Sequence, residues 1–217
     1  MTQAPLKVAV LASGRGSNLA SLIAARDAGT LPVEFVLVGS DKASAGALRL
    51  AESAGIPTLA LNPKSYPDRP SFDRALFDRI AASGAGLLVL AGFMRVIDAA
   101  VVAEWEGRAI NIHPSLLPKY PGLHTHRRCL EAGDAEHGAS VHYVTAELDG
   151  GPVVAQARIP VGAADTEATL AERLLAEEHK LLPAVVGAIA SGRLRWSGKA
   201  MFDGRPLAAP LTLAQLS

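Results

Sequence analysis

Three residues in the middle of the chain could polarise a carbonyl group and move a proton. Asn111 and His113 stand two positions apart at the end of an apolar run, so an extended backbone would place both side chains on one side. An asparagine amide can donate a hydrogen bond to a developing oxyanion, and a histidine can donate another or transfer a proton. Asp149, which precedes Gly150 and Gly151, is the candidate carboxylate to hold the imidazole and raise its pKa, and an ordinary turn aspartate is the alternative. We therefore predict that Asn111, His113 and Asp149 act together on one carbonyl group.

A second candidate site is the loop at residues 13–18, which reads Ser-Gly-Arg-Gly-Ser-Asn and precedes a helical pattern. Glycines let the backbone approach an anion, and a helix N-terminus with Ser17 and Asn18 favours negative charge, so a phosphate fits there. Leu19 stands where the dinucleotide fingerprint needs a third glycine, and no Gly-Lys-Ser/Thr follows, which argues against dinucleotides and nucleoside triphosphates. A capped helix start without a ligand is the alternative.

Histidines cluster in the same region as the first site. The chain has six, and five of them fall within thirty residues, at positions 113, 124, 126, 137 and 142. Such a cluster indicates acid/base chemistry or a metal site. His124 and His126 could share one face of a strand, but a catalytic zinc usually has three protein ligands at ordered spacing, and the neighbouring prolines indicate loop packing. We predict no metal site, and a hydrogen-bonded structural role for most of these histidines.

A third feature is an acidic residue on an apolar helix face. Glu178 lies on the stripe formed by Ala171, Leu174, Leu175, Leu181, Leu182 and Val185. A carboxylate facing a protein interior is costly unless it is paired. Glu178 is therefore expected to meet either a buried basic group or a ligand cation such as an amine.

Alternating strands and helices must position these groups. The expected strands lie at residues 7–12, 33–38, 57–61, 87–91 and 108–112, and the expected helices at residues 18–28, 43–53 and 71–82. Strands that are continuous apolar runs are typical of a parallel sheet covered on both faces. We predict an α/β fold with an open, mostly parallel, doubly wound sheet and a Rossmann-like N-terminal half, which binds ligands at the carboxyl ends of its strands.

The second half of the chain changes in character. Pro114, Pro118 and Pro121 predict an irregular loop, which is followed by strands at residues 140–144 and 153–159. A long helix is predicted over residues 166–182, and Pro183 is expected to end or kink it before residues 185–189 continue it. We predict one unit, residues 1–217, with functional halves at about 1–107 and 108–217.

Composition narrows the classes of partner. Hydrophobic residues make up 49% of the chain and charged residues 19%, which argues against disorder. Lys plus Arg and Asp plus Glu are both 21, so the chain lacks the basic surplus of a nucleic-acid or membrane-surface binder, and small-molecule ligands are favoured. One cysteine, no signal-peptide pattern and no membrane-length apolar run lead us to expect a cytoplasmic protein.

Taken together, these motifs resemble a known family. They are the segments at residues 13–18, 91–95, 111–122, 124–126, 138–142 and 147–152. The combination closely resembles the phosphoribosylglycinamide formyltransferase family, the glycinamide ribonucleotide transformylases of purine synthesis. The Asn-x-His-Pro-Ser-Leu-Leu-Pro…Asp pattern alone is shared by the wider folate-dependent formyltransferases, including the methionyl-tRNA enzymes. The 13–18 loop and the absence of a basic C-terminal extension favour the ribonucleotide enzymes over the tRNA enzymes.

The resemblance implies a formyltransferase fold and a specific reaction. A formyl group would pass from 10-formyltetrahydrofolate, a co-substrate, to the amine of 5-phosphoribosylglycinamide, with no metal and no covalent enzyme intermediate. The resemblance implies that Gly16, Ser17 and Asn18 hold the substrate phosphate and that Glu178 holds the ribose end. The folate would be held by Arg69, Met94, Arg95, Val96, Ile97, Asn111, Thr145, Ala146, Glu147, Leu148 and Asp149. The partners would be these small molecules, and the protein a monomer or homodimer.

Two positions depart from the family pattern. Leu175 stands where a polar contact to the substrate is expected, and Arg15 adds a positive charge to the phosphate loop. We expect Asn111 and protonated His113 to stabilise the oxyanion of a tetrahedral intermediate, Asp149 to keep His113 charged, and a water held by Asp149 to relay the proton. The alternatives are another folate enzyme that transfers or hydrolyses formyl groups, including a formyltetrahydrofolate deformylase or a nucleotide-sugar formyltransferase, and a nucleotide-binding module without chemistry.

Overall fold

The predicted strands form one open sheet of seven strands in the order β3-β2-β1-β4-β5-β6-β7. The computed structural model describes residues 4–216. The strands are β1 (Leu6–Leu11), β2 (Val33–Ser40), β3 (Thr58–Ala60), β4 (Leu87–Leu90), β5 (Ala109–His113), β6 (Glu136–Tyr143) and β7 (Val153–Pro160). The first five pair in parallel, and β6 and β7 are antiparallel, which confirms the mostly parallel α/β sheet. The strand order reverses between β1 and β4, and such a reversal opens a ligand crevice at the carboxyl edge.

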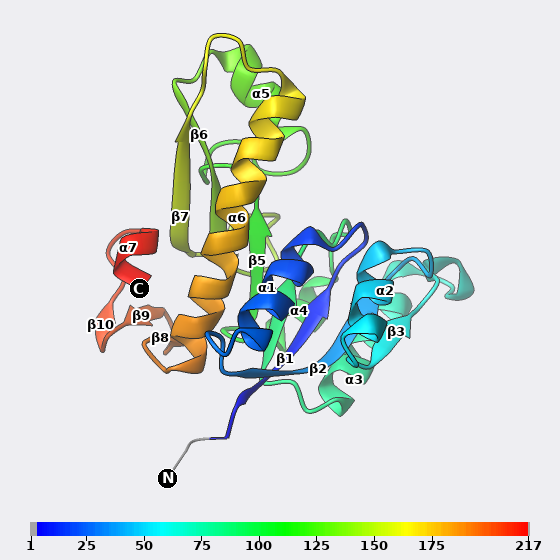
Figure 1. The fold of residues 1–217 in the computed structure, drawn as a ribbon. Coiled ribbons are helices and arrows are strands. Elements are labelled where there is room, and N and C mark those ends of the chain that lie inside the picture. The colour runs from blue at the N-terminus through cyan, green and yellow to red at the C-terminus, as the bar shows by residue number, and fades with distance from the viewer. Residues whose placement is uncertain (1–3, 217) are drawn as a thin grey trace.

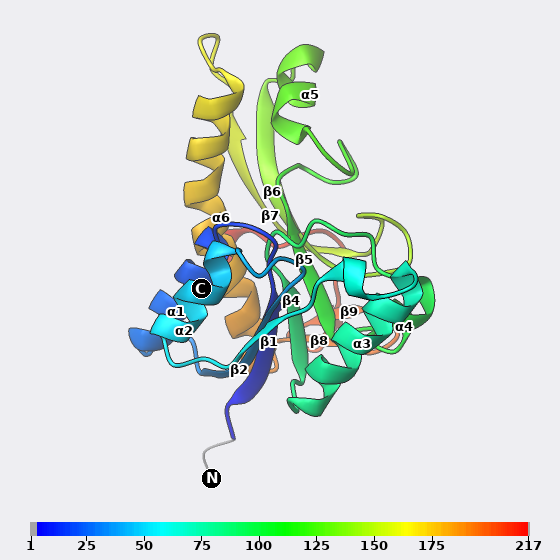
Figure 2. The same cartoon turned by 90° about the vertical axis from the view of Figure 1, so that its right-hand side faces the viewer.

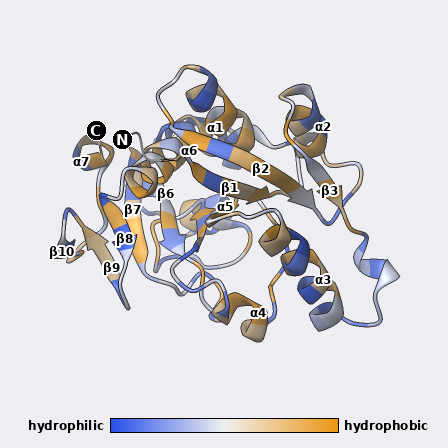
Figure 3. Cartoon of the chain, turned by 90° about the horizontal axis from the view of Figure 1, so that it is seen from below, coloured by the Kyte–Doolittle hydropathy of each residue, from blue (hydrophilic) through white to orange (hydrophobic). Residues whose placement is uncertain are grey.

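Helices cover both faces of this sheet (Figures 1 and 2). One face carries α1 (Ser17–Asp27), α2 (Gly46–Ser53) and α6 (Glu167–Ala190), and the other carries α3 (Arg69–Ala82) and α4 (Ala99–Ala103). Alternate side chains of β1 serve the two layers, because Val8 and Val10 join one apolar cluster and Ala9 and Leu11 join the other. Figure 3 shows the apolar strands enclosed between the helices. Burial on both faces explains the continuous apolar runs of the sequence.

The remaining elements were not predicted from the sequence. They are the 3-10 turn at Pro63–Ser65, α4, α5 (Thr125–Ala132), β8 (Leu194–Trp196), β9 (Ala200–Phe202), β10 (Arg205–Pro206) and α7 (Leu213–Leu216). His124 and His126 do not share a strand, which was considered as one possibility, since His124 has a left-handed backbone with φ 59° and His126 belongs to α5. Only Thr125 and Cys129 of α5 are buried, and most residues of this short helix are polar, so it offers too few apolar residues for a sequence prediction.

Helix α6 continues through Pro183 to Ala190, so the helix does not end there, which was one of the two predicted outcomes. Proline in a helix interior removes a hydrogen bond and clashes with the carbonyl four residues earlier. On both sides of Pro183 one face of the helix is fully buried, with Leu181, Leu182, Val185 and Val186 packed in the core. Apolar packing therefore holds the helix together across the proline.

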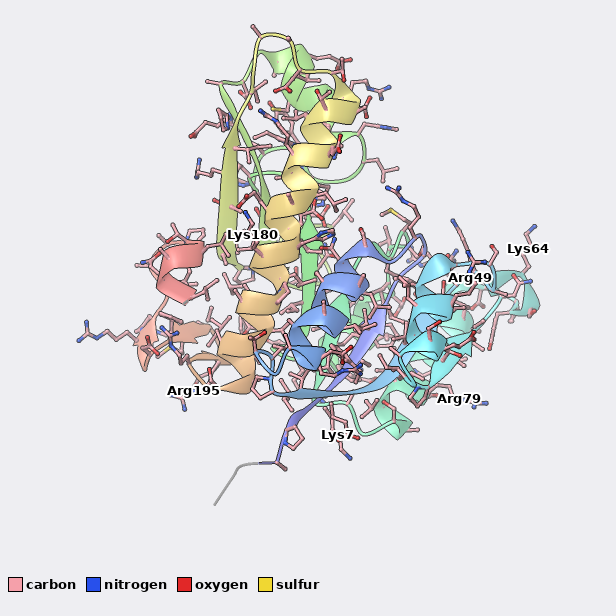
Figure 4. The ribbon with its side chains drawn as sticks, viewed as in Figure 1. Lys7, Arg49, Lys64, Arg79, Lys180 and Arg195 are labelled. Carbon is pink, nitrogen blue, oxygen red and sulfur yellow. The ribbon has the colours of Figure 1, made fainter. Side chains whose placement is uncertain are left out.

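The surface charges are spread over the molecule. Figure 4 labels six basic side chains, Lys7, Arg49, Lys64, Arg79, Lys180 and Arg195, which project outward from different elements. Within residues 4–216, no helix combines the length and the apolar character needed to cross a lipid bilayer.

Replacing Pro183 with alanine tests the account of α6. Alanine restores the backbone N–H and removes the ring, so we expect Pro183→Ala to raise the free energy of unfolding by roughly 1–3 kcal/mol in urea titrations. Pro152→Ala, in the exposed turn before β7, is the control and should give no such gain. A lower free energy of unfolding for Pro183→Ala would show that the proline itself contributes to packing.

Candidate active site

The carboxyl end of β5 carries Asn111 and His113, and the β6–β7 loop brings Asp149 to them. His113 Nδ1 lies 3.4 Å from Asp149 Oδ2, and Asn111 Nδ2 lies 3.4 Å from Asp149 Oδ1. The structure thus brings the three predicted catalytic residues together and contains the hypothesised contact between Asp149 and His113. The loop can turn back because Gly151 passes directly over the Tyr143 carbonyl, where a Cβ atom would collide.

Asp149 is the centre of this arrangement. Its side chain is 9% exposed, its backbone has a left-handed φ of 51°, and its Oδ2 accepts a hydrogen bond from the Gly122 backbone N–H at 2.8 Å. Burial acts to raise the pKa of Asp149, but the contacts with His142, the Gly122 amide and His113 outweigh it and lower that pKa below its ordinary value. Asp149 is therefore a carboxylate at neutral pH.

His142 orients the amide of Asn111. The two residues face each other across the antiparallel β5–β6 pair, and His142 Nε2 lies 3.0 Å from Asn111 Nδ2. His142 Nδ1 donates to the Tyr143 carbonyl at 2.9 Å, and its Nε2 also lies 3.6 Å from Asp149 Oδ1. The amide nitrogen of Asn111, rather than its oxygen, faces His142. Its second N–H is left for Asp149 or for a substrate oxyanion. We counted His142 among the clustered histidines but missed this role, which only the strand register reveals.

His113 is held from both sides. Its Nε2 donates to the Tyr120 carbonyl at 2.9 Å, and its Nδ1 faces Asp149. Burial lowers the pKa of His113, and the Tyr120 carbonyl and Asp149, which act to raise it, only partly offset that effect. Burial and the contact with Asp149 thus act on the His113 pKa in opposite directions, and the expectation that Asp149 keeps His113 charged stays a prediction; Nδ1 beside Asp149 is the position where the ring takes up a proton.

Two adjoining cavities meet at Asn111 and Asp149. The larger, about 560 Å³, runs between the segment at residues 92–96 and the wall formed by residues 113–114 and 122–126, with Glu167 at its rim. The smaller, about 80 Å³, is lined by Arg95, Val96, Ile97, His142 and residues 144–149 among others. Four exposed apolar side chains lie around the larger cavity, namely Met94, Val96, Leu123 and Leu148. An apolar cavity with polar groups at one point suits a flat ligand with one reacting end.

The residues assigned to folate by resemblance mostly line these cavities. Met94, Arg95, Val96 and Ile97 do so, as do Thr145, Ala146, Glu147, Leu148 and Asp149. Arg69 does not: it begins α3, is exposed, and is absent from the residues that line either cavity. The structure therefore does not place Arg69 among the residues that line the two cavities.

The glycine-rich loop starts α1 at the carboxyl end of β1. Gly16 has a left-handed φ of 84°, and a Cβ there would lie 2.7 Å from Ala47 Cα, so the position requires glycine. Asn18 is buried and donates from Nδ2 to Glu178 Oε2 at 2.7 Å, while its Oδ1 has no partner among the described residues. Arg15 is exposed in the same loop.

Glu178 is buried, as the apolar stripe predicted, with 8% exposure. Its partner is the Asn18 amide and not a buried basic group, which corrects one of the two expectations. Burial raises the pKa of Glu178, and the hydrogen bond from Asn18 acts in the opposite direction. A carboxyl group short of partners remains available to a ligand hydroxyl or amine.

The loop and the cleft are directly connected. The Ser13 backbone N–H donates to the Gly92 carbonyl at 3.0 Å, and the Met94 N–H donates to Ser13 Oγ at 3.0 Å. These two bonds join the loop after β1 to the segment after β4, on either side of the point where the strand order reverses.

Two further histidines pair at the wall of the larger cavity, where His126 lines the cavity and His137 is buried. His126 Nδ1 lies 3.0 Å from His137 Nε2, and burial, followed by the neighbouring His126, lowers the pKa of His137 to about 4. Among the residues from 4 to 216, no group of three or more His, Cys, Asp or Glu side chains could hold a metal ion.

Comparisons with known proteins agree with this site. Residues 6–186 match the family model described as formyl transferase. The chain is 46% identical over 203 residues to phosphoribosylglycinamide formyltransferase of Escherichia coli, covering 93% of this chain and 96% of that one. It is 41% identical over 189 residues to the human trifunctional purine biosynthetic protein adenosine-3, of which it covers 19%.

A solved structure extends the similarity to three dimensions. The phosphoribosylglycinamide formyltransferase of Coxiella burnetii superimposes with a TM-score of 0.92 at 45% identity, covering 96% of this chain and 99% of that one. The chain therefore belongs to the formyl transferase family and, within it, to the phosphoribosylglycinamide formyltransferases.

Proposed function

We propose that the protein transfers the formyl group of 10-formyltetrahydrofolate to the amine of 5-phosphoribosylglycinamide, a step in purine synthesis. The observation that carries this proposal is the convergence of Asn111, His113 and Asp149 where the two cavities meet. A hydrogen-bond donor, a neutral base and a carboxylate at one point are the groups that acyl transfer to an amine requires. A nucleotide-binding module without chemistry would have no use for them.

The two substrates would approach from different sides. The ribonucleotide phosphate would bind Gly16, Ser17 and Asn18 at the N-terminus of α1, and Glu178 would accept a hydrogen bond from the ribose end. This division assigns ribonucleotide binding to the half at about residues 1–107, although Glu178 comes from the other half. Leu175 offers no polar contact, so the phosphate depends more on the loop, where exposed Arg15 adds positive charge.

The folate would occupy the two cavities. Arg95, Val96, Ile97 and residues 145–149 would surround one end, and the apolar rim would cover the rest. Both halves of the chain thus contribute to this site. Arg69, which lies outside both cavities, could reach only a part of the ligand that extends beyond them.

The proposed chemistry begins with the uncharged amine attacking the formyl carbon. As the carbonyl oxygen gains negative charge, the free N–H of Asn111 donates to it, in an orientation set by His142. The amine proton passes to His113 Nδ1, and the carboxylate of Asp149 stabilises the imidazolium that forms. The same proton is then delivered, through a water held by Asp149, to the folate nitrogen as the C–N bond breaks. Tetrahydrofolate and the formylated ribonucleotide leave, and none of these steps uses a metal.

A formyl-transfer assay with both substrates tests this function. We expect product only when both substrates are present, and we expect product to form equally well when EDTA is added. We expect Asn111→Ala or Asp149→Asn to lower kcat by roughly 10²–10³-fold. Glu172→Gln, an exposed residue of α6, is the control. Formate release without the ribonucleotide would indicate a deformylase instead, and a fall in kcat of less than about tenfold would remove the proposed roles of both residues.

Titration of His113 tests the proposed state of the free site. Because burial lowers the pKa of His113, its ring signals in NMR spectra should titrate below pH 6.5, with the His113→Gln variant identifying the signals. Asp149→Asn removes a charge that raises this pKa, so the midpoint should move lower still. A midpoint above 6.5, or an upward shift in Asp149→Asn, contradicts a neutral starting imidazole.

A carboxylate deletion tests the ribonucleotide side. Glu178→Ala should raise KM for the ribonucleotide by about tenfold or more and leave KM for the folate within about twofold. Glu177→Ala is the matched control, because Glu177 is the adjacent residue and pairs with Lys180 on the outer surface. A rise in the folate KM alone would place the ribose elsewhere.

A further inference from the structure

The segment at residues 92–98 has no regular secondary structure, yet it forms one side of both cavities. One end is fixed to the phosphate loop through the Met94 N–H and Ser13 Oγ. The other end is fixed to α3, because the Asp98 N–H donates to Asp73 Oδ2 at 2.8 Å. The shape of the cleft therefore depends on hydrogen bonds to Ser13 and Asp73, which line neither cavity.

Asp73 is a carboxylate in an apolar part of the protein interior. It belongs to α3, has 0% exposure, and lies within the apolar layer that contains Phe72, Leu76 and Phe77. A carboxylate in such a layer is costly unless its oxygens are satisfied. The Asp98 amide satisfies one oxygen, while Oδ1 is buried without a partner among the described residues.

The cleft segment also carries a positively charged residue, Arg95, that packs against α3. Arg95 stacks its guanidinium over the Phe72 ring at 4.9 Å, and its Nε is also buried without a partner in the described chain. Burial raises the pKa of Asp73, and the hydrogen bond from the Asp98 amide and the charges of Arg95 and Arg69 act to lower it. Asp73 thus contacts the end of the segment and attracts its only arginine.

We propose that Asp73 is a positioning residue for folate binding: its carboxylate fixes the segment at residues 92–98 through the Asp98 N–H and holds Arg95 over Phe72 at the cavity wall. This inference rests on the proposed function, because it concerns the same folate cavity. Asp73 lines neither cavity and touches no substrate. Its loss should therefore affect binding of the folate and spare the chemistry at Asn111 and Asp149.

Two substitutions separate the hydrogen bond from the charge. Asp73→Ala removes both, and we expect KM for 10-formyltetrahydrofolate to rise about tenfold or more, with kcat and the ribonucleotide KM within about threefold. Asp73→Asn keeps an oxygen for the Asp98 amide but removes the charge beside Arg95, so its folate KM should rise by only about threefold. Asp78→Ala, an exposed carboxylate of the same helix, is the control and should match the wild type.

Hydrogen exchange gives a readout that is independent of activity. The Asp98 amide should exchange about 100-fold faster in Asp73→Ala than in the wild type, and near the wild-type rate in Asp73→Asn. The Kd of tetrahydrofolate, measured by calorimetry, should follow the folate KM. A wild type that binds tetrahydrofolate but transfers no formyl group would refute the proposed function while leaving these two measurements to decide the role of Asp73.

Three outcomes would overturn the proposal. They are an unchanged folate KM in Asp73→Ala, an equal rise in both KM values, and an Asp98 amide whose exchange does not change. If Asp73→Ala fails to fold, Asp73→Asn decides the matter, and an unchanged folate KM in that variant overturns the proposal.

Discussion

The buried carboxylate of Asp149 is the interaction on which the site depends. A carboxylate that is 9% exposed must have polar partners around it, and the partners it collects are the groups that would perform the chemistry. Asp149 contacts the Gly122 backbone N–H in the proline-rich loop, and it contacts the side chains of His113 and Asn111 at the end of β5. Satisfying one charge therefore assembles segments that are far apart in the sequence. The left-handed backbone at Asp149 is the conformational cost of aiming that carboxylate inward.

Much of this could be predicted from the sequence, because the relevant signals are local. Continuous apolar runs predicted the parallel sheet, the spacing of Asn111 and His113 predicted a shared side, and the apolar stripe predicted the burial of Glu178. The rest depends on tertiary contacts. The pairing of His142 with Asn111 requires the register of β5 and β6, and the lowering of the His113 pKa requires knowing how deeply it is buried. Helix α6 passes through Pro183 because of packing that a local proline rule does not include.

The balanced net charge of the chain coexists with a site that fits anions. Positive potential is local: Arg15 lies beside the N-terminus of α1, and Arg95 lies at the wall of both cavities. These two regions are joined by hydrogen bonds between Ser13 and the segment that carries Arg95. In the proposed function, the ribonucleotide and folate sites are thus parts of one crevice at the reversal of the strand order. The walls of this crevice are kept in place by buried polar side chains and not by helices or strands.

The central claim is that Asn111 presents a donor to the formyl oxygen beside the His113–Asp149 pair. A crystal structure with the ribonucleotide and a non-transferable formyl-folate analogue bound together tests it most directly. The account predicts a carbonyl oxygen about 2.7–3.1 Å from Asn111 Nδ2, with the amine on the side of His113 Nδ1 and Asp149. A carbonyl oxygen bound away from Asn111, or an Asn111 amide turned so that its oxygen faces His142, would contradict it.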